Sequence, residues 1–207
     1  MILDSKCKKC RRAGQKLFLK GERCFSQKCA MTRRPYPPGV HGKSFRRRMS
    51  EYGQQLAEKQ KVRYAYGVSE HQFKKYFKEI VKQKGDKEEI FIRKLEVRLD
   101  NVVFRFGWAK SRRLARQIVS HGHILVNQRK VNIPSYQVKK GDVIKIKEKS
   151  KKLALFKNME ISLKKYEVPE WLSLDKKKIE GKIKDEPKID NLSEFGEISM
   201  IIEYYSR

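Results

Sequence analysis

Residues 111–126 are Ser-Arg-Arg-Leu-Ala-Arg-Gln-Ile-Val-Ser-His-Gly-His-Ile-Leu-Val, and they contain the change of periodicity that decides the fold. Before Gly122 the apolar residues recur at helical spacing, and Ser111 is the predicted N-cap of the helix. From His123 onward apolar and polar residues alternate, which is typical of strands. A helix that passes directly into a hairpin indicates a small α+β unit. The predicted strands are His123–Val126, Lys130–Ile133 and Val138–Lys147.

The helix predicted over residues 111–121 has two chemically different faces. At about 100° per residue, its apolar side chains fall on one side and its polar side chains on the other. A charged helix face is most often merely solvated, but a guanidinium group suits phosphate oxygens and the adjoining hairpin is also basic. We therefore predict that the polar face binds nucleic acid. The apolar face consists of Leu114, Ala115, Ile118 and Val119, and the polar face of Arg112, Arg113, Arg116 and Gln117.

The charge of the whole chain indicates a polyanionic partner. Its 207 residues include 51 Lys and Arg against 24 Asp and Glu, a net charge of +27, which repels itself unless a polyanion is near. No apolar run of about 18 residues and no signal-peptide core is visible, which predicts a cytoplasmic protein without a membrane partner. Residues 1–65 hold 18 Lys and Arg against 4 Asp and Glu, whereas residues 166–207 hold 7 against 10. We expect the acidic C-terminal part to fold back on the protein or to meet a protein neighbour.

All four cysteines lie within the first 30 residues, as Cys7-x2-Cys10-x13-Cys24-x4-Cys29. Two closely spaced pairs can bring four thiolates together around one metal ion. Nothing else in the sequence is typical of a secreted protein, so disulfides are disfavoured. We predict a structural metal knuckle with zinc as the ion, and four thiolates also suit an iron–sulfur cluster.

A proline- and arginine-rich strap follows the cysteines, Arg33-Arg34-Pro35-Tyr36-Pro37-Pro38-Gly39, and Arg46-Arg47-Arg48 comes soon after it. The prolines exclude a helix and favour an extended path. Such a strap can lie along RNA with its arginines on phosphates and the Tyr36 ring stacked on a base. The alternative is a disordered basic linker.

The remaining pattern is mainly helical. Ser50 is the predicted N-cap of a helix that reaches Tyr66 and ends before Gly67. Ser69 is the predicted N-cap of the next helix, where it forms a capping box with Gln72. We expect one helix over Glu88–Phe106, a return to helix after about Ser150, and a strand or extended segment over Met200–Tyr205. The predicted core stripe of the second helix is Phe73, Tyr76, Phe77, Ile80 and Val81.

Several longer motifs together resemble one family, the bacterial ribosomal protein S4 family. The resemblance covers nearly the whole chain, and its motifs occur in the order of the family. They are the Cys7–Cys29 segment, Gly21-Glu22-Arg23-Cys24, the strap, Glu58-Lys59-Gln60-Lys61, Arg98-Leu99-Asp100-Asn101-Val102-Val103, His121-Gly122-His123-Ile124, Pro134-Ser135-Tyr136, Trp171-Leu172-Ser173-Leu174-Asp175 and Ile202-Glu203-Tyr204-Tyr205-Ser206-Arg207.

The resemblance implies an α+β fold with three parts. A mainly helical domain over residues 46–92 and 151–207 would contain an inserted α+β RNA-binding module of the S4 type over residues 93–150. The metal knuckle and the strap would occupy residues 1–45.

The resemblance also implies a function. The protein would be a structural constituent of the small ribosomal subunit, without a small-molecule substrate. It would bind 16S rRNA at a multi-helix junction of the 5′ domain early in assembly. It would touch ribosomal protein S5 where mRNA enters the subunit, with mRNA as a further partner and an influence on decoding accuracy. Some family members also repress their own operon.

The residues and the resemblance together give one set of predicted RNA contacts in three regions of the chain. These are Arg11, Arg12, Arg33, Arg34, Tyr36, Arg46, Arg47 and Arg48; Lys59, Lys61 and Arg63; and Arg112, Arg113, Arg116, Gln117, His121 and Lys130.

Two features depart from the family pattern. Asn127-Gln128 replaces the usual Asn-Gly turn, and Gln at a position with positive φ costs on the order of 1 kcal/mol, so we expect a different turn. Some family members lack the cysteines, so the metal is not essential to the common function.

Two other functions compete with the ribosomal one. Pseudouridine synthases carry the same module and an Arg-Leu-Asp motif, which stands here as Arg98-Leu99-Asp100, but the remaining residues are too few for their catalytic domain. A zinc-bearing DNA-binding regulator is disfavoured because the cysteines lack the finger spacing and the basic residues are spread over the chain. We therefore predict a protein that is not an enzyme.

Overall fold

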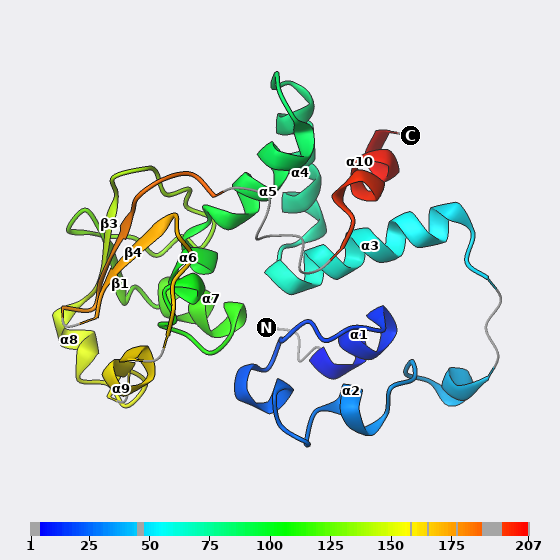
Figure 1. Ribbon diagram of the computed structural model, residues 1–207, viewed down its shortest axis with the longest axis horizontal. Helices are drawn as coiled ribbons and strands as arrows, with labels where there is room; N and C mark the ends of the chain where they lie inside the picture. The colour runs from blue at the N-terminus through cyan, green and yellow to red at the C-terminus, as the bar shows by residue number, and fades with distance from the viewer. Residues whose placement is uncertain are drawn as a thin grey trace. The chain divides into compact units, whose positions relative to one another are not determined.

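The computed structural model describes residues 5–44, 48–157, 159–164, 166–176, 178–187 and 196–206. The chain forms two compact units, Met1–Phe91 with Ile189–Arg207, and Ile92–Lys188. The second unit is therefore inserted in the sequence of the first (Figure 1). The first unit is helical and the second contains a sheet, so the predicted α+β class is confirmed. In the part of the chain that the structure describes, no helix has the length and apolar character needed to cross a membrane.

The N-terminal part of the first unit consists of short helical turns. Gly14 has φ 70° and ends the first of them, since this left-handed conformation suits glycine. After the last turn, the Arg46 and Arg47 positions lie outside the described residues. The turns are α1 (Lys6–Ala13), η1 (Gly21–Cys24), α2 (Ala30–Arg33) and η2 (Val40–Lys43).

Helices α3 (Glu51–Tyr66) and α4 (Glu70–Val81) begin as the sequence predicts. The Ser50 hydroxyl accepts a hydrogen bond from the Gly53 amide, and the Ser69 hydroxyl accepts one from the Gln72 amide. Both predicted caps are confirmed. The predicted core stripe of α4 is buried except for Val81, which is 50% exposed because it lies in the last turn of the helix.

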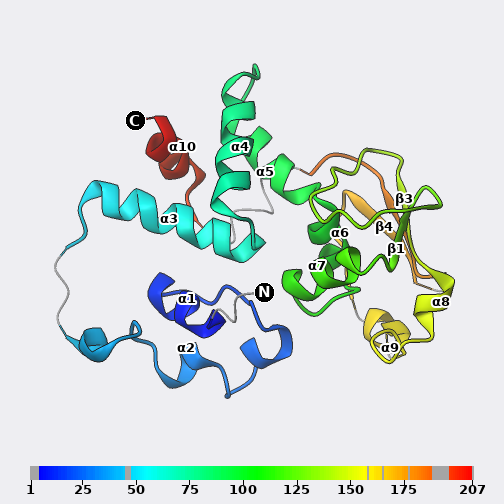
Figure 2. The ribbon, with the colours of Figure 1, turned by 180° about the vertical axis from the view of Figure 1, so that it is seen from behind.

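Helix α10 (Ile198–Ser206) packs against α3, although more than 130 residues separate them in the sequence (Figures 1 and 2). Ile201 is fully buried, and the Tyr205 ring stacks on Phe77 with ring centroids 4.8 Å apart. The predicted strand over Met200–Tyr205 is therefore wrong. An apolar run beside a long helix is better buried as a helix, because its own backbone satisfies its hydrogen bonds.

The predicted single helix over residues 88–106 is also wrong, because it is two helices, α5 (Lys87–Glu96) and α6 (Leu99–Arg105). Arg98 between them has extended backbone angles, φ −68° and ψ 136°. The amides of Leu99 and Asp100 bond the carbonyls of Tyr136 and Pro134, at 2.8 and 3.1 Å. These distant partners satisfy the donors that a continuous helix would have used.

The second unit contains a five-stranded antiparallel sheet in the order β2-β1-β3-β5-β4. The two predicted hairpin strands and the third strand are present but shorter than predicted. Two further strands, which the sequence pattern did not indicate, complete the sheet at residues 172–183. The strands are β1 (Ile124–Val126), β2 (Arg129–Lys130), β3 (Val143–Ile146), β4 (Leu172–Asp175) and β5 (Glu180–Ile183).

The domain boundary predicted near residue 150 differs from the structure, because β5 pairs with β3 and joins residues 151–188 to the second unit. Three acidic residues of this segment meet bases of the same unit, in the pairs Lys145–Glu180, Lys140–Asp185 and Arg93–Glu186. Glu180, Asp185 and Glu186 of the acidic C-terminal part therefore fold back on the protein, as expected. The helices α8 (Glu148–Lys151) and α9 (Met159–Lys164) come before these strands, as the expected return to helix.

The core of the second unit lies between the sheet and helices α6 and α7 (Arg112–Ser120) (Figure 2). Phe106 is fully buried there and stacks on Trp108 with ring centroids 5.0 Å apart. Gly181 in β5 leaves room for this ring, since a Cβ atom at position 181 would lie 2.2 Å from Phe106 Cζ. This close approach fixes α6 over the sheet and, with it, the polar residues at the start of α6.

Candidate nucleic-acid interface

Helix α7 presents the two faces that its sequence predicts. Ala115, Ile118 and Val119 are buried, while Arg113 and Gln117 are exposed. The Ser111 hydroxyl accepts a hydrogen bond from the Leu114 amide and fixes the start of the helix. The exposed face therefore stands on a helix that is packed and capped.

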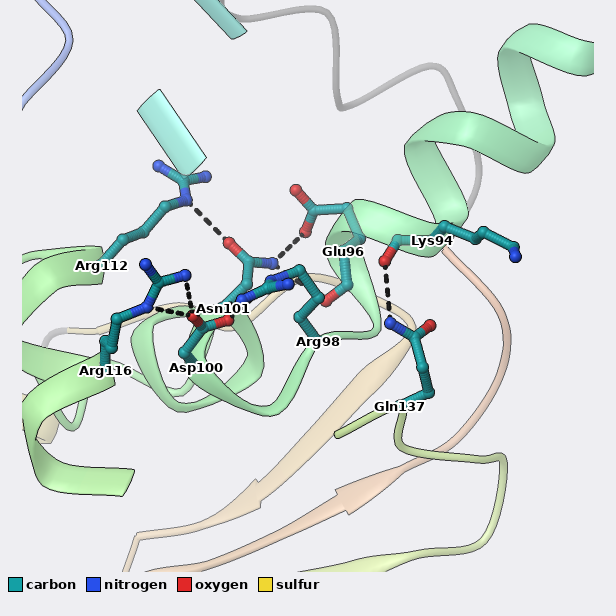
Figure 3. A network of polar contacts seen from close by, with 8 residues as sticks. All are labelled: Lys94, Glu96, Arg98, Asp100, Asn101, Arg112, Arg116 and Gln137. Atoms are coloured by element: carbon teal, nitrogen blue, oxygen red, sulfur yellow. Dashed lines mark hydrogen bonds and ion pairs between the residues drawn. The ribbon is translucent and has the colours of Figure 1, made fainter. Parts of the chain in front are cut away.

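Arg116, on the polar face of α7, forms an ion pair with Asp100 of α6 through two hydrogen bonds to one carboxylate oxygen (Figure 3). Its Nε and Nη2 atoms donate to Asp100 Oδ2 at 2.9 and 2.8 Å. The same carboxylate accepts from Arg98 Nε and Nη2, at 3.0 and 2.9 Å. The side chains of Arg98 and Asp100 are only 3% and 4% exposed, whereas that of Arg116 is 35% exposed. One buried carboxylate thus serves two guanidinium groups.

Arg112, one turn before Arg116, is held by Asn101, whose Oδ1 accepts from Arg112 Nε at 2.7 Å (Figure 3). Asn101 Nδ2 donates to the carbonyl oxygen of Glu96 and to Glu96 Oε2, at 3.0 and 2.9 Å. Because both acceptors take the amide nitrogen, the amide oxygen must face Arg112. Arg105 forms a further bidentate pair with Glu96, and Arg112 lies over the Phe104 ring at 4.6 Å.

At the corner between α7 and β1, Lys130 lies close over Gly122, where a Cβ atom would meet Lys130 Cε at 2.2 Å. His121 is exposed, and its ring lies 6.0 Å from that of His123. Burial lowers the pKa of His123, and the neighbouring His121, Lys147 and Lys130 lower it further. His123 Nδ1 and Ser150 Oγ lie 2.9 Å apart, so a protein partner orients this ring. Lys130 and Lys147 beside the two histidines therefore make this corner a basic surface.

The turn of the hairpin keeps positive φ at both Asn127 and Gln128, 47° and 68°. Our expectation of a different turn is wrong. Asn127 Nδ2 donates to Asp142 Oδ1 at 2.8 Å, and its Oδ1 accepts from the Val143 amide at 2.9 Å. These two bonds stabilise the left-handed backbone that Gln128 alone would disfavour.

In the N-terminal part, Arg11 organises the strap that follows the cysteines. Its guanidinium group donates to the carbonyl oxygens of Arg34, Tyr36 and Pro37, and it lies over the Tyr36 ring at 4.8 Å. Lys43 lies over the same ring at 5.3 Å. Cations of the protein therefore flank Tyr36, for which we predicted a stacked base. Four other predicted contacts are exposed, namely Arg12, Arg33, Arg34 and Arg48.

Of the predicted RNA contacts on α3, Lys59 has an internal role. It is 3% exposed, and its Nζ donates to Glu70 Oε1 at 2.7 Å and lies over the Tyr204 ring at 4.4 Å. Direct RNA contact by Lys59 is not compatible with this burial, so this prediction is wrong. Lys61 pairs with Glu58, and Arg63 pairs with Glu70 at 3.3 Å. RNA contacts of Lys61 and Arg63 stay predictions.

Glu70 accepts a second hydrogen bond, from the Tyr205 hydroxyl at 2.8 Å, which ties α10 to α4. Burial alone would raise the pKa of Glu70, but the hydrogen bonds from Lys59 and Tyr205 and the charges of Lys59 and Arg63 outweigh it. The pKa of Glu70 is therefore lowered. Burial and the Glu70 carboxylate raise the pKa of Tyr205.

The four cysteines are free thiols, three of them buried and Cys7 half-buried. Burial raises the pKa of Cys10, and the charges of Cys24, Cys7 and Cys29 raise it further, whereas a backbone hydrogen bond from Leu17 lowers it. The Lys20 amide also donates to Cys24 Sγ at 3.4 Å. Among the residues that the structure describes, however, no three His, Cys, Asp or Glu side chains are arranged to hold a metal ion. The predicted metal knuckle is therefore not confirmed.

The sequence patterns did not reveal the buried polar residues behind α7. Arg98-Leu99-Asp100 was considered only as a sequence motif, and Glu96 and Asn101 were not assigned a role in the site. A signal was present, because four polar or charged residues occur within six positions of a segment whose other members are apolar. Buried polar groups need partners, which these residues supply to one another and to α7.

Taken together, the inserted module, its basic helix and the basic N-terminal segment define a nucleic-acid-binding protein. Residues 2–96 match the family described as Ribosomal protein S4/S9 N-terminal domain, and residues 97–144 match the S4 domain.

Full-length relatives agree with these matches. The small ribosomal subunit protein uS4 of Thermus thermophilus is 51% identical over 201 residues, covering 97% of this chain and 96% of the relative. That of Syntrophomonas wolfei is 46% identical over 204 residues, covering 99% and 98%. Protein uS4A of Bdellovibrio bacteriovorus is 48% identical over 206 residues, covering 100% and 99%.

The chain belongs to the uS4 family of small ribosomal subunit proteins. It is thus a structural protein that binds 16S rRNA, as predicted, and not an enzyme. The cytoplasmic location predicted for it follows from membership of the small subunit.

Proposed function

We propose that the chain binds 16S rRNA at a multi-helix junction of the 5′ domain, through the exposed face of α7 and the adjoining corner, early in assembly of the subunit. One observation carries this proposal. Helix α7 buries its apolar side against the sheet and leaves Arg113 and Gln117 exposed, with His121 and Lys130 exposed at its C-terminal end. Phosphate contacts of this kind give tight but salt-sensitive binding.

Binding of a 5′-domain transcript at several KCl concentrations tests this proposal. Because each neutralised phosphate releases counterions, log K should fall by roughly 0.7–0.9 per unit of log salt for each contact. Replacing Arg112, Arg113 and Arg116 together by Ala should weaken binding and flatten this slope. A control variant with the exposed Lys74, Lys75 and Lys78 of α4 replaced by Ala removes the same charge from another surface. Equal slopes for both variants, or equal competition by duplex DNA of the same length, would contradict the proposal.

The proposal extends to protein and mRNA neighbours. The family resemblance supports contact with ribosomal protein S5 where mRNA enters the subunit, with an effect on decoding accuracy. Cross-linking in intact small subunits tests this contact directly. Cross-links to S5 and to mRNA are expected, and their absence from subunits that contain the protein would contradict this part.

We further propose that the four cysteines bind a structural metal ion, as in a cysteine-containing type of the family. The fit rests on the donor set, because all four cysteines lie within 23 residues of sequence, three of them are buried, and the Lys20 amide donates to Cys24 Sγ. Four thiolates suit zinc first and an iron–sulfur cluster second. The bound ion would order the N-terminal segment and the basic residues around it.

Elemental analysis of the purified chain tests the metal. About one equivalent of zinc is expected, and iron with acid-labile sulfide would indicate a cluster. Cys10→Ser should remove the metal and loosen the first 30 residues, measured by limited proteolysis, while the second unit stays folded. Less than about half an equivalent of any metal in the wild-type chain would contradict the proposal.

A further inference from the structure

We infer that Asp100 is a positioning residue for RNA binding, which fixes the Arg116 guanidinium group so that its outer edge meets a backbone phosphate. The inference deepens the proposed function and rests on it. It assigns a role to a carboxylate that is too deeply buried to touch RNA itself.

The geometry divides the Arg116 guanidinium group into two edges. Its five N–H groups form a planar fork, and the Nε and Nη2 atoms use one edge on Asp100 Oδ2. The Asp100 side chain is 4% exposed and that of Arg116 is 35% exposed, and the second edge of the Arg116 guanidinium group points away from Asp100 (Figure 3). This edge, which includes Nη1, has the bidentate geometry that phosphate oxygens accept.

Asp100 cannot follow Arg116 outward when RNA binds. Its carboxylate is held by the buried Arg98, and its backbone amide donates to the Pro134 carbonyl at 3.1 Å. Two guanidinium groups share this one carboxylate. Because the rotamer of Arg116 is fixed before binding, less side-chain entropy is lost in the complex.

Asn101 acts in a similar way on the neighbouring arginine. It holds Arg112 by Nε alone, and its own orientation is fixed by two bonds to Glu96. Arg112 and Arg116 are four residues apart on α7, where two like charges repel each other. The Asp100 carboxylate and the Asn101 amide, both on α6, therefore hold together a pair of cations that would otherwise move apart.

The most informative variant keeps the positive charge of residue 116 but removes the planar set of N–H donors of the guanidinium group. Arg116→Lys retains one positive charge but cannot bind Asp100 by one edge and a phosphate by the other. Arg93→Lys is the matched control, because Arg93 is in the same unit, its side chain is also 35% exposed and it also pairs with a carboxylate, Glu186. Arg93 is not one of the predicted RNA contacts.

Binding of the full-length variants to the 5′-domain transcript is measured at several KCl concentrations, with folding checked by thermal unfolding. R116K should bind about tenfold more weakly with an unchanged salt slope, because the number of charges is the same but the geometry is lost. R93K should bind within about twofold of wild type. If the Arg116–Asp100 pair only stabilised the fold, R116K would lower the melting temperature without this loss of RNA affinity.

Asp100→Asn supplies the second measurement. If Asp100 acts through Arg116, D100N should add little to the loss of affinity already caused by R116K. Should D100N fail to fold because Arg98 loses its counter-charge, the comparison of R116K with R93K decides alone.

The results separate this inference from the proposed function. Equal, small effects of R116K and R93K in a chain that still binds the transcript tightly would overturn the positioning role and leave the function standing. A wild-type chain that does not prefer the transcript to duplex DNA would overturn both.

Discussion

Gly181 allows the sharpest test of how the fold holds the RNA-binding surface. In the substitution Gly181→Ala, the new Cβ atom would lie 2.2 Å from Cζ and 2.5 Å from Cε1 and Cε2 of Phe106. Carbon atoms in ordinary contact are at least about 3.5 Å apart, so the ring must move by more than 1 Å. Phe106 is fully buried and stacked on Trp108, which leaves it little room to do so.

The expected loss follows from two opposing effects. Overpacking a well-packed core costs about 1–3 kcal/mol, whereas Ala in place of Gly within a strand recovers roughly 0.5–1 kcal/mol of backbone entropy. We therefore expect G181A to lower the free energy of unfolding by about 1–2 kcal/mol. For a unit of this size, each kcal/mol corresponds to ~4–8 °C in melting temperature.

Tryptophan fluorescence during urea unfolding measures this loss in the second unit alone. The chain has two tryptophans, Trp108 and Trp171, and both lie between Ile92 and Lys188. The double variant F106L/G181A should be less destabilised than the sum of its single changes, because Leu makes room for the added methyl group. An unchanged or raised stability of G181A, or full additivity with F106L, would refute the reasoning.

The remaining predictions concern the first unit. Tyr205→Phe removes the hydroxyl that donates to Glu70 at 2.8 Å, so it should destabilise this unit by about 1 kcal/mol, measured by hydrogen exchange of α3 and α10 amides. Unchanged protection would contradict this. Because the pKa of Glu70 is lowered in the folded protein, its contribution to stability is complete above the ordinary value of 4.5 and is lost as the pH falls through the lowered one. Glu70→Gln should therefore flatten the acid limb of a stability–pH profile, and an identical limb in both proteins would argue against it. The pKa of Tyr205 is raised, so its contribution is complete below 10.0 and is lost at higher pH. Wild type should then lose more stability than Y205F in urea titrations above that pH.

The parts of the fold that local chemistry determines could be predicted from the sequence. Ser50, Ser69 and Ser111 each cap a helix by accepting an amide three residues later, so their signal lies within one turn of chain. The two faces of α7 follow from helical spacing alone. The same holds for Gly67, whose φ of 65° ends α3.

The parts that depend on distant partners could not be predicted. The break at Arg98 depends on the carbonyls of Pro134 and Tyr136, and the strand at 180–183 depends on β3. The apolar run at 200–205 has strand-like composition, and only the surface of α3 makes it a helix. In each case tertiary contacts outweigh the local preference.

The candidate site shows the same division. Helical spacing predicts which side chains of α7 are polar, but not that Arg116 and Arg112 are held by Asp100 and Asn101. Spacing likewise places Lys59 on a helix surface, whereas the α10 segment covers it. The net charge of the chain correctly predicts a nucleic-acid partner. It does not predict whether a particular Lys or Arg side chain contacts that partner or another residue of the protein.

The packing of α10 on α3 also bears on the order in which the protein folds during synthesis. All residues of the sheet-containing unit are made in one uninterrupted stretch, so this unit can fold as soon as that stretch has left the exit tunnel. Helix α3 emerges earlier, yet it must wait for α10, which is translated after the whole insertion. Until then, the apolar surface around Val62 and Phe77 lacks its cover, and nascent chains should depend on chaperones or on early RNA binding during this interval.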